Sequence, residues 1–197
     1  MSKSDASSAK KERNRAIRWV VTIFIVTIIV SATISFISEE LMATSSMVVA
    51  FLILFLIIII GIVFDVIGVA VTSADEKPFH SMAARKVRGA QEAIRLLRNA
   101  ERVGSICNDV VGDICGVVSG AASATIAAQI VSNFSGTAPQ VISLAMSALA
   151  AGVTVAGKAV GKSMAIHSCT QIVHRTGKII WLFTHIPQQF REKKNKR

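Results

Sequence analysis

Charged side chains are rare within long apolar stretches, and four such residues of this chain stand out as candidates for chemistry. Asp65 lies in the second such stretch, Asp109 and Asp113 in the third, and Lys158 in the fourth. Each costs about 2.5–3.5 kcal/mol at the centre of a membrane helix on insertion scales, so each is expected to pair or to face a polar cavity. Three carboxylates and one ammonium leave a net charge of −2, which calls for a bound cation or for protonated aspartates.

The depths of three of these residues agree. Asp65 stands about eight residues before the end of its stretch, Asp109 about six after the start of its own, and Lys158 a few before the end. At about 1.5 Å per residue they share one layer of the membrane. Two interpretations remain open. The layer is either a cation site, formed by the three aspartates and Asn108, or a salt-bridge network in which Lys158 pairs with an aspartate.

The elements that must position these residues are long apolar helices. The 197 residues are 52% hydrophobic, with a mean hydropathy of +0.55. Residues 16–38 and 47–73 each exceed the roughly 20 residues needed to cross about 30 Å of hydrocarbon. Residues 103–133 and 139–163 are built from smaller side chains and predict two more spans, a soluble Ala/Gly-rich helical pair being the alternative. The sequence therefore predicts an all-α, polytopic membrane protein with four transmembrane helices in a lipid bilayer.

Glycines recur at four-residue spacing in the third and fourth predicted spans. Gly112, Gly116 and Gly120 form one series, and Gly157 and Gly161 form another. Small residues at this spacing let helix backbones approach closely inside a membrane. We therefore expect these two helices to be the inner ones, and we expect the chain to form a homodimer through them.

The basic residues predict the orientation. All 22 Lys and Arg lie in residues 3–18, 77–102 and 158–197, and the two remaining loops carry none. With an even number of spans, the positive-inside rule places both termini in the cytoplasm of a multi-pass protein of the cell membrane. Anionic lipid head groups are the expected partner of these charges, and no nucleic-acid-binding motif is present. The segments outside the spans are a basic tail (1–15), an amphipathic cytoplasmic helix (74–102), and an amphipathic juxtamembrane helix with a basic end (164–197).

Four short patterns, in order along residues 50 to 175, resemble a known family. Residues 64–73 (FDVIGVAVTS) follow in part a helix end of the form F-S-x-x-E-T-A-x-x-S, and residues 89–102 follow G-A-x-x-A-x-x-L-L-x-x-x-x-R. Residues 108–113 stand at a G-N-x-x-x-N element, and residues 157–163 stand at G-E-x-x-P-K-S. Together they resemble the transmembrane domain of the CorB/CorC/cyclin-M family of magnesium transporters.

The resemblance implies transport of Mg²⁺ or a related divalent cation, with departures from the family's site. Asp65 stands at the family's serine position, and Asn108, Asp109 and Asp113 stand at or beside its asparagines. Lys158 replaces its glutamate, so an ammonium stands where a cation ligand is expected. The expected protein is a short form without the family's CBS domains. The alternative is a transport-inactive member, a membrane scaffold in which Lys158 replaces the bound cation as a counter-charge.

An enzyme is not expected. The chain shows no nucleophile–base pair, phosphate-binding loop or catalytic metal motif. The three cysteines, Cys107, Cys115 and Cys169, lie in or beside apolar helices and are expected to act as small apolar residues.

Overall fold

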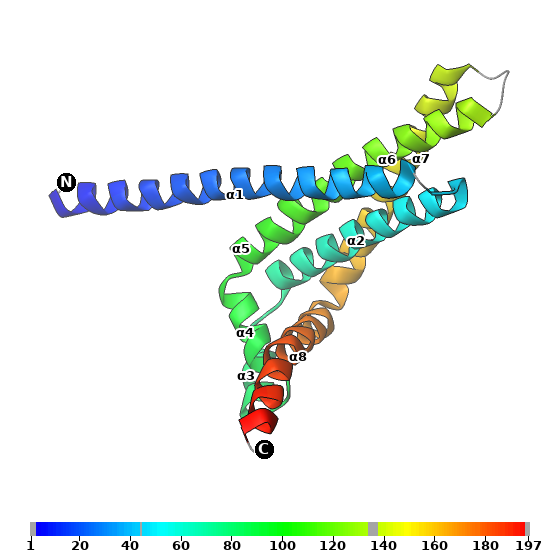
Figure 1. The fold of residues 1–197 in the computed structure, drawn as a ribbon. Coiled ribbons are helices and arrows are strands. Elements are labelled where there is room, and N and C mark those ends of the chain that lie inside the picture. Colours follow the sequence, from blue (N-terminus) through cyan, green and yellow to red (C-terminus); the bar gives the residue numbers. More distant parts are fainter. Residues whose placement is uncertain (1–2, 44, 134–137, 196–197) are drawn as a thin grey trace.

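The computed structural model describes residues 3–43, 45–133 and 138–195 of the chain, and within these ranges it is all-α, with no strand (Figure 1). Four helical stretches among them are long and apolar enough to cross a membrane: Arg13–Met42, Met47–Ser73, Ala100–Asn133 and Pro139–His167. Their lengths of 27 to 34 residues exceed the roughly 20 that a bilayer requires. The prediction of an all-α, multi-pass membrane protein is therefore confirmed.

The second helix stands at the centre of the membrane part. This helix, α2 (Met47–Ser73), packs along α7 (Pro139–His167) and α6 (Asp113–Asn133), which also pack on each other. The first helix, α1 (Lys3–Ala43), crosses α6 at an angle and touches α2 less (Figure 1). Most apolar side chains of α1 are exposed, because in a bilayer this helix faces lipid over most of its length.

The third span is not one uniform α-helix. It begins with α5 (Ala100–Ser105), continues through the π-helical segment η1 (Ile106–Gly112), and ends with α6. A π-helix is wider than an α-helix, and such segments are rare and frequently mark functional sites. Both α5 and η1 pack against the second half of α2.

The glycine series of the two inner helices behave differently. A Cβ at Gly157 would overlap Ile62, and a Cβ at Gly161 would lie 2.6 Å from Val66 Cγ2, so α7 approaches α2 closely at both glycines. In contrast, nothing lies within 4 Å of a Cβ at Gly116 or Gly120. The expected close approach therefore occurs on α7, whereas these two α6 glycines lie on a face that no other helix of the described chain covers.

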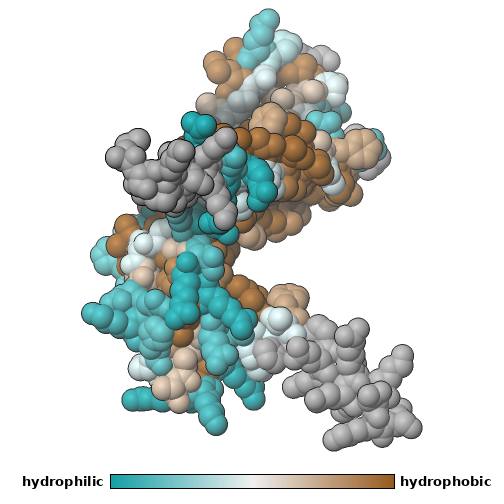
Figure 2. All heavy atoms as spheres, turned by 90° about the vertical axis from the view of Figure 1, so that its left-hand side faces the viewer, coloured by the Kyte–Doolittle hydropathy of each residue, from teal (hydrophilic) through white to brown (hydrophobic). Residues whose placement is uncertain are grey.

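A polar helical cap stands at one end of the bundle. It consists of α3 (Lys77–Ala84), α4 (Ala90–Arg98) and α8 (Cys169–Asn195). Figure 2 shows hydrophilic side chains gathered over the lower part of the molecule, at the height of these helices in Figure 1, and hydrophobic side chains above them. In Figure 1 the ends of α2 and α7 that follow Asp65 and Lys158 lead into this cap, whereas the N-terminal end of α1 projects away from it.

The predicted single amphipathic helix over 74–102 is divided in the structure. The chain turns at 85–89, where Lys86 and Gly89 have positive φ angles of 57° and 83°, and it breaks again at Asn99. Glycine adopts this positive φ without strain. Position 89 also has no room for a side chain, since a Cβ there would lie 2.5 Å from the backbone nitrogen of Lys178 on α8. The turn thus lets α4 dock directly on the α8 backbone.

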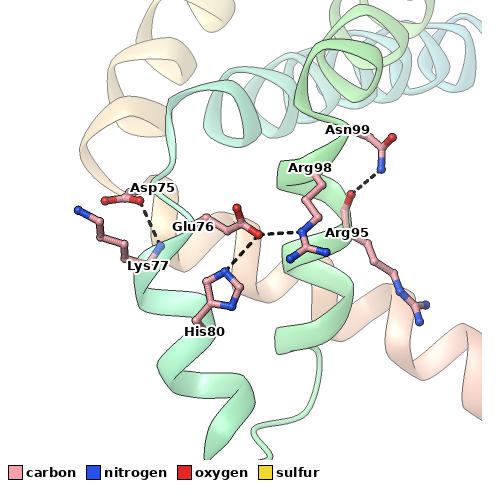
Figure 3. Close-up of polar contacts among 7 residues, drawn as sticks. All are labelled: Asp75, Glu76, Lys77, His80, Arg95, Arg98 and Asn99. Atoms are coloured by element: carbon pink, nitrogen blue, oxygen red, sulfur yellow. Dashed lines mark hydrogen bonds and ion pairs between the residues drawn. The ribbon is translucent and has the colours of Figure 1, made fainter.

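Polar and apolar contacts both hold the cap together. Glu76, just before α3, accepts a hydrogen bond from Arg98 Nε at 3.0 Å and lies 3.3 Å from His80 Nε2 (Figure 3). Beneath these groups Phe79 is fully buried, 0% exposed, against Val71, Ala93 and other apolar side chains. The ion pairs are exposed, so the apolar contacts supply most of the stability.

Candidate functional site

Asp65 is the buried charge at the centre of the site. It lies on α2, and its residue is only 4% exposed. Its Oδ1 atom lies 3.9 Å from the Cβ position of Gly112, the last residue of η1, so the carboxylate faces the π-helical segment. Its Oδ2 atom is buried and accepts no hydrogen bond, although the Lys162 ammonium lies 4.0 Å away. A buried carboxylate oxygen without a donor is costly and requires an explanation.

Asn108, on η1, lies at the same contact between α2 and η1. Its side-chain amide occupies the space that a Cβ at Gly68 would fill, so it is seated against α2. Gly68 and Asp65 are three residues apart, hence neighbours on one helix face. The Oδ1 atom of Asn108 is also buried without a donor. The contact between α2 and η1 therefore contains two oxygen acceptors that no described residue satisfies.

Lys158 is tied to the end of the π-helical segment. Its Nζ atom donates a hydrogen bond of 3.3 Å to the Gly112 carbonyl and lies 4.0 Å from Asp113 Oδ1. The ammonium lies 3.4 Å from the Cβ position of Gly112, so the absence of a side chain there makes room for it. The Lys158 side chain is 21% exposed and that of Asp113 is 74% exposed. Lys158 therefore closes one side of the site.

The other two predicted carboxylates are exposed, unlike Asp65. Asp109 is exposed, and its Oδ2 accepts a hydrogen bond from Ser105 Oγ at 2.8 Å. Asp113 is exposed, and its Oδ1 lies 4.0 Å from the Lys158 ammonium. In the described part of the chain, no three His, Cys, Asp or Glu side chains form a group that could hold a metal ion. Of the four residues predicted to share a cation, Asp65 and Asn108 are buried at one helix contact, whereas Asp109 and Asp113 are exposed.

Lys162 is the site residue to which the sequence interpretation gave no role. It lies one turn beyond Lys158 on α7, and its ammonium, not that of Lys158, is paired with Asp65. The four-residue spacing of the two lysines places both on one helix face, which was the available signal. With both counted, two ammonium groups stand beside Asp65 and Asp113, so the charge of this cluster balances.

The cysteines follow the expectation of small apolar residues: Cys107 and Cys115 are buried and Cys169 is half-buried, all three as free thiols. Comparison of the chain with protein-family models, with curated proteins and with solved structures found no match.

Proposed function

We propose that this chain transports a small cation across the membrane, Mg²⁺ or a related divalent cation, through the contact between α2 and η1. One observation carries the proposal: Asp65 Oδ2 and Asn108 Oδ1 are both buried without donors at the contact between α2 and η1. Asn108 is seated against Gly68, about one helical turn from Asp65 on α2. Carboxylate and amide oxygens are preferred ligands of Mg²⁺, and Mg²⁺ keeps several waters when protein ligands are few. Two protein oxygens therefore suit a partly hydrated ion in passage.

The π-helical segment supports the same assignment. It places Asn108 toward α2, and its last residue, Gly112, accepts a hydrogen bond from Lys158. Non-helical backbone geometry at membrane depth is tolerated where it lines a polar path or is packed in protein. The resemblance to the CorB/CorC/cyclin-M transporters, drawn from residues 64–73, 108–113 and 157–163, points to the same cargo.

The orientation and the partners belong to this proposal. The basic cap faces the cytoplasm and anionic lipid head groups, so the site opens toward the cytoplasmic side of the cell membrane. A second copy of the chain covers the open face of α6, which carries Asp113, Gly116, Val117 and Gly120. A carboxylate as exposed as Asp113 is poorly tolerated against lipid, whereas a protein neighbour shields it.

The proposal is tested by Mg²⁺ uptake into dye-loaded proteoliposomes that contain the purified chain. We expect uptake above that of empty vesicles and loss of most of it in Asn108→Ala. The matched control is Asn133→Ala, an exposed asparagine at the end of α6, which should keep the wild-type rate. Equal uptake rates in the two variants would show that Asn108 does not take part in transport.

A second candidate, a transport-inactive membrane scaffold, is favoured by the charge balance of the cluster. Lys162 stands beside Asp65, and Lys158 beside Asp113, so both carboxylates have counter-charges without a cation. In such a scaffold, Lys158→Glu leaves excess negative charge in the membrane and creates a cation requirement for folding. Folded wild-type protein that gives no uptake, together with Mg²⁺-dependent folding of Lys158→Glu, would support the scaffold.

A further inference from the structure

We propose that Lys162 is a displaceable counter-charge: its ammonium balances Asp65 when no cation is bound, and the entering cation replaces it. This inference rests on the proposed function and assigns a positioning residue to the same site. Lys162 would set how tightly the site holds its cargo, without itself touching the cation.

The side chains of Asp65 and Lys162 differ in how exposed they are and therefore in how freely they can move. Asp65 is 4% exposed and held inside the helix contact, whereas the Lys162 side chain is 54% exposed. Their closest atoms are 4.0 Å apart, beyond the 2.7–3.2 Å of a hydrogen bond. The attraction is therefore electrostatic, and no directional bond has to break for the ammonium to leave.

The position of Lys162 near the end of α7 lets its ammonium reach the lipid head-group layer. The residue lies five positions before His167, the last residue of the helix, or roughly 8 Å along the axis. A lysine at this depth can extend its aliphatic stem and carry its charge to the head-group layer. Lys162 can therefore leave Asp65 without exposing a charge to hydrocarbon.

Lys158 lacks this freedom, although it is only one turn away. Its ammonium donates to the Gly112 carbonyl at 3.3 Å, fills the space beside that glycine, and is 21% exposed. The two lysines therefore have different roles. Lys158 fixes the end of η1, and Lys162 exchanges with the cargo.

Charge exchange has a consequence for affinity. A cation that must displace an ammonium binds more weakly than one that meets a free carboxylate, because the lost attraction between Lys162 and Asp65 is subtracted from the attraction that the cation gains. Removing the Lys162 charge should therefore strengthen cation binding. A lysine that only supported the fold would have no such effect, and its loss would weaken binding or stability.

The first test measures the Mg²⁺ concentration that gives half of the maximal thermal stabilisation of the full chain in detergent, since a ligand of the folded state raises its unfolding temperature. In Lys162→Gln this concentration should fall by at least about fivefold, a modest value for one unit charge at this separation in a partly exposed site. Lys162→Arg keeps the charge and should stay within about twofold of wild type. Lys77→Gln, an exposed lysine of α3, is the control for loss of charge alone.

The second test needs no variant that might misfold. Acetylation of lysines with a water-soluble reagent is read by peptide mass spectrometry on wild-type protein, with and without Mg²⁺. The reactivity of Lys162, relative to Lys77, should rise when Mg²⁺ is present, because the displaced ammonium is more accessible.

An unchanged or higher half-saturating concentration in Lys162→Gln, or no rise in Lys162 reactivity, would overturn the counter-charge proposal. These failures differ from failure of the transport function. If wild-type protein shows neither uptake nor Mg²⁺ stabilisation, the function itself is wrong. If wild type shows both and Asp65→Asn loses both, but Lys162→Gln behaves like wild type, only the role of Lys162 is wrong.

Discussion

The amide of Asn108 occupies the space beside Gly68 that any larger residue at position 68 would need. This relationship joins the π-helical segment to α2 within one helical turn of Asp65. A residue without a side chain on one helix therefore determines where a polar group of another helix can stand. The site depends on both partners of this contact.

Gly68→Ala should displace Asn108 and reduce Mg²⁺ uptake strongly, with a modest loss of stability. The obstructing atom is the end of a movable side chain, so the cost should lie at the low end of the roughly 1–3 kcal/mol typical of overpacking. Uptake in proteoliposomes and thermal unfolding in detergent measure the two effects. Gly152→Ala on α7 is the control, because nothing lies within 4 Å of a Cβ there. Equal uptake in the two variants would show that the seat of Asn108 is not needed.

Gly161→Ala should destabilise the bundle, whereas Gly152→Ala on the same helix should not. At position 161 the new methyl would lie 2.6 Å from Val66 Cγ2, a stiff β-branched side chain, but at position 152 nothing lies within 4 Å. We expect a loss of about 1–3 kcal/mol in the first variant and a gain of up to about 1 kcal/mol in the second. Unfolding of both in the same detergent decides whether α7 packs on α2 at this point.

In the polar cap, Phe79→Ala should cost far more stability than Glu76→Gln. Phe79 is fully buried, and removal of such a ring typically costs about 3–5 kcal/mol. Glu76 is partly exposed, and exposed ion pairs contribute about 0–1 kcal/mol. Chemical unfolding of each variant gives the comparison. A larger loss in Glu76→Gln would mean that the ion pairs, not the apolar core, hold α3 to α4.

If a second copy covers the open face of α6, Gly116→Cys should form a disulfide-linked dimer and Gly157→Cys should not. Gly116 lies in open space, whereas Gly157 is packed against Ile62 within one protomer. The native cysteines are replaced by alanine in both variants so that only the new thiol reacts. Oxidation in membranes followed by non-reducing electrophoresis reads the outcome. Crosslinking at Gly157 alone would place the dimer contact on α7.

Hydropathy was sufficient to predict the four apolar helices, and the common membrane layer of Asp65, Asp109 and Lys158 stays a prediction. Long apolar runs demand spanning helices, and charge is so costly inside them that each ionisable residue stands out. The lysines and arginines of residues 77–98 lie in the polar cap at one end of the bundle.

The geometry of the site could not be predicted in the same way. No residue preference marks the π-helical segment. Its geometry nevertheless directs Asn108 toward α2, whereas Asp109 accepts a hydrogen bond from Ser105. The two glycine series look alike as motifs, but only tertiary packing decides that Gly161 meets a neighbour and Gly116 does not. The turn at 85–89 similarly depends on the docking of Gly89 on α8.

The most direct test of the central claim is the initial rate of Mg²⁺ uptake by Asp65→Asn, measured beside Asp75→Asn in the same preparation of vesicles. Asp75 is exposed before α3 and caps the Lys77 amide, a role that asparagine can also fill. The cation site predicts that Asp65→Asn loses at least about nine-tenths of the uptake, which corresponds to about 1.4 kcal/mol, while Asp75→Asn keeps the wild-type rate. Wild-type uptake in Asp65→Asn would contradict the claim that the cation passes this carboxylate.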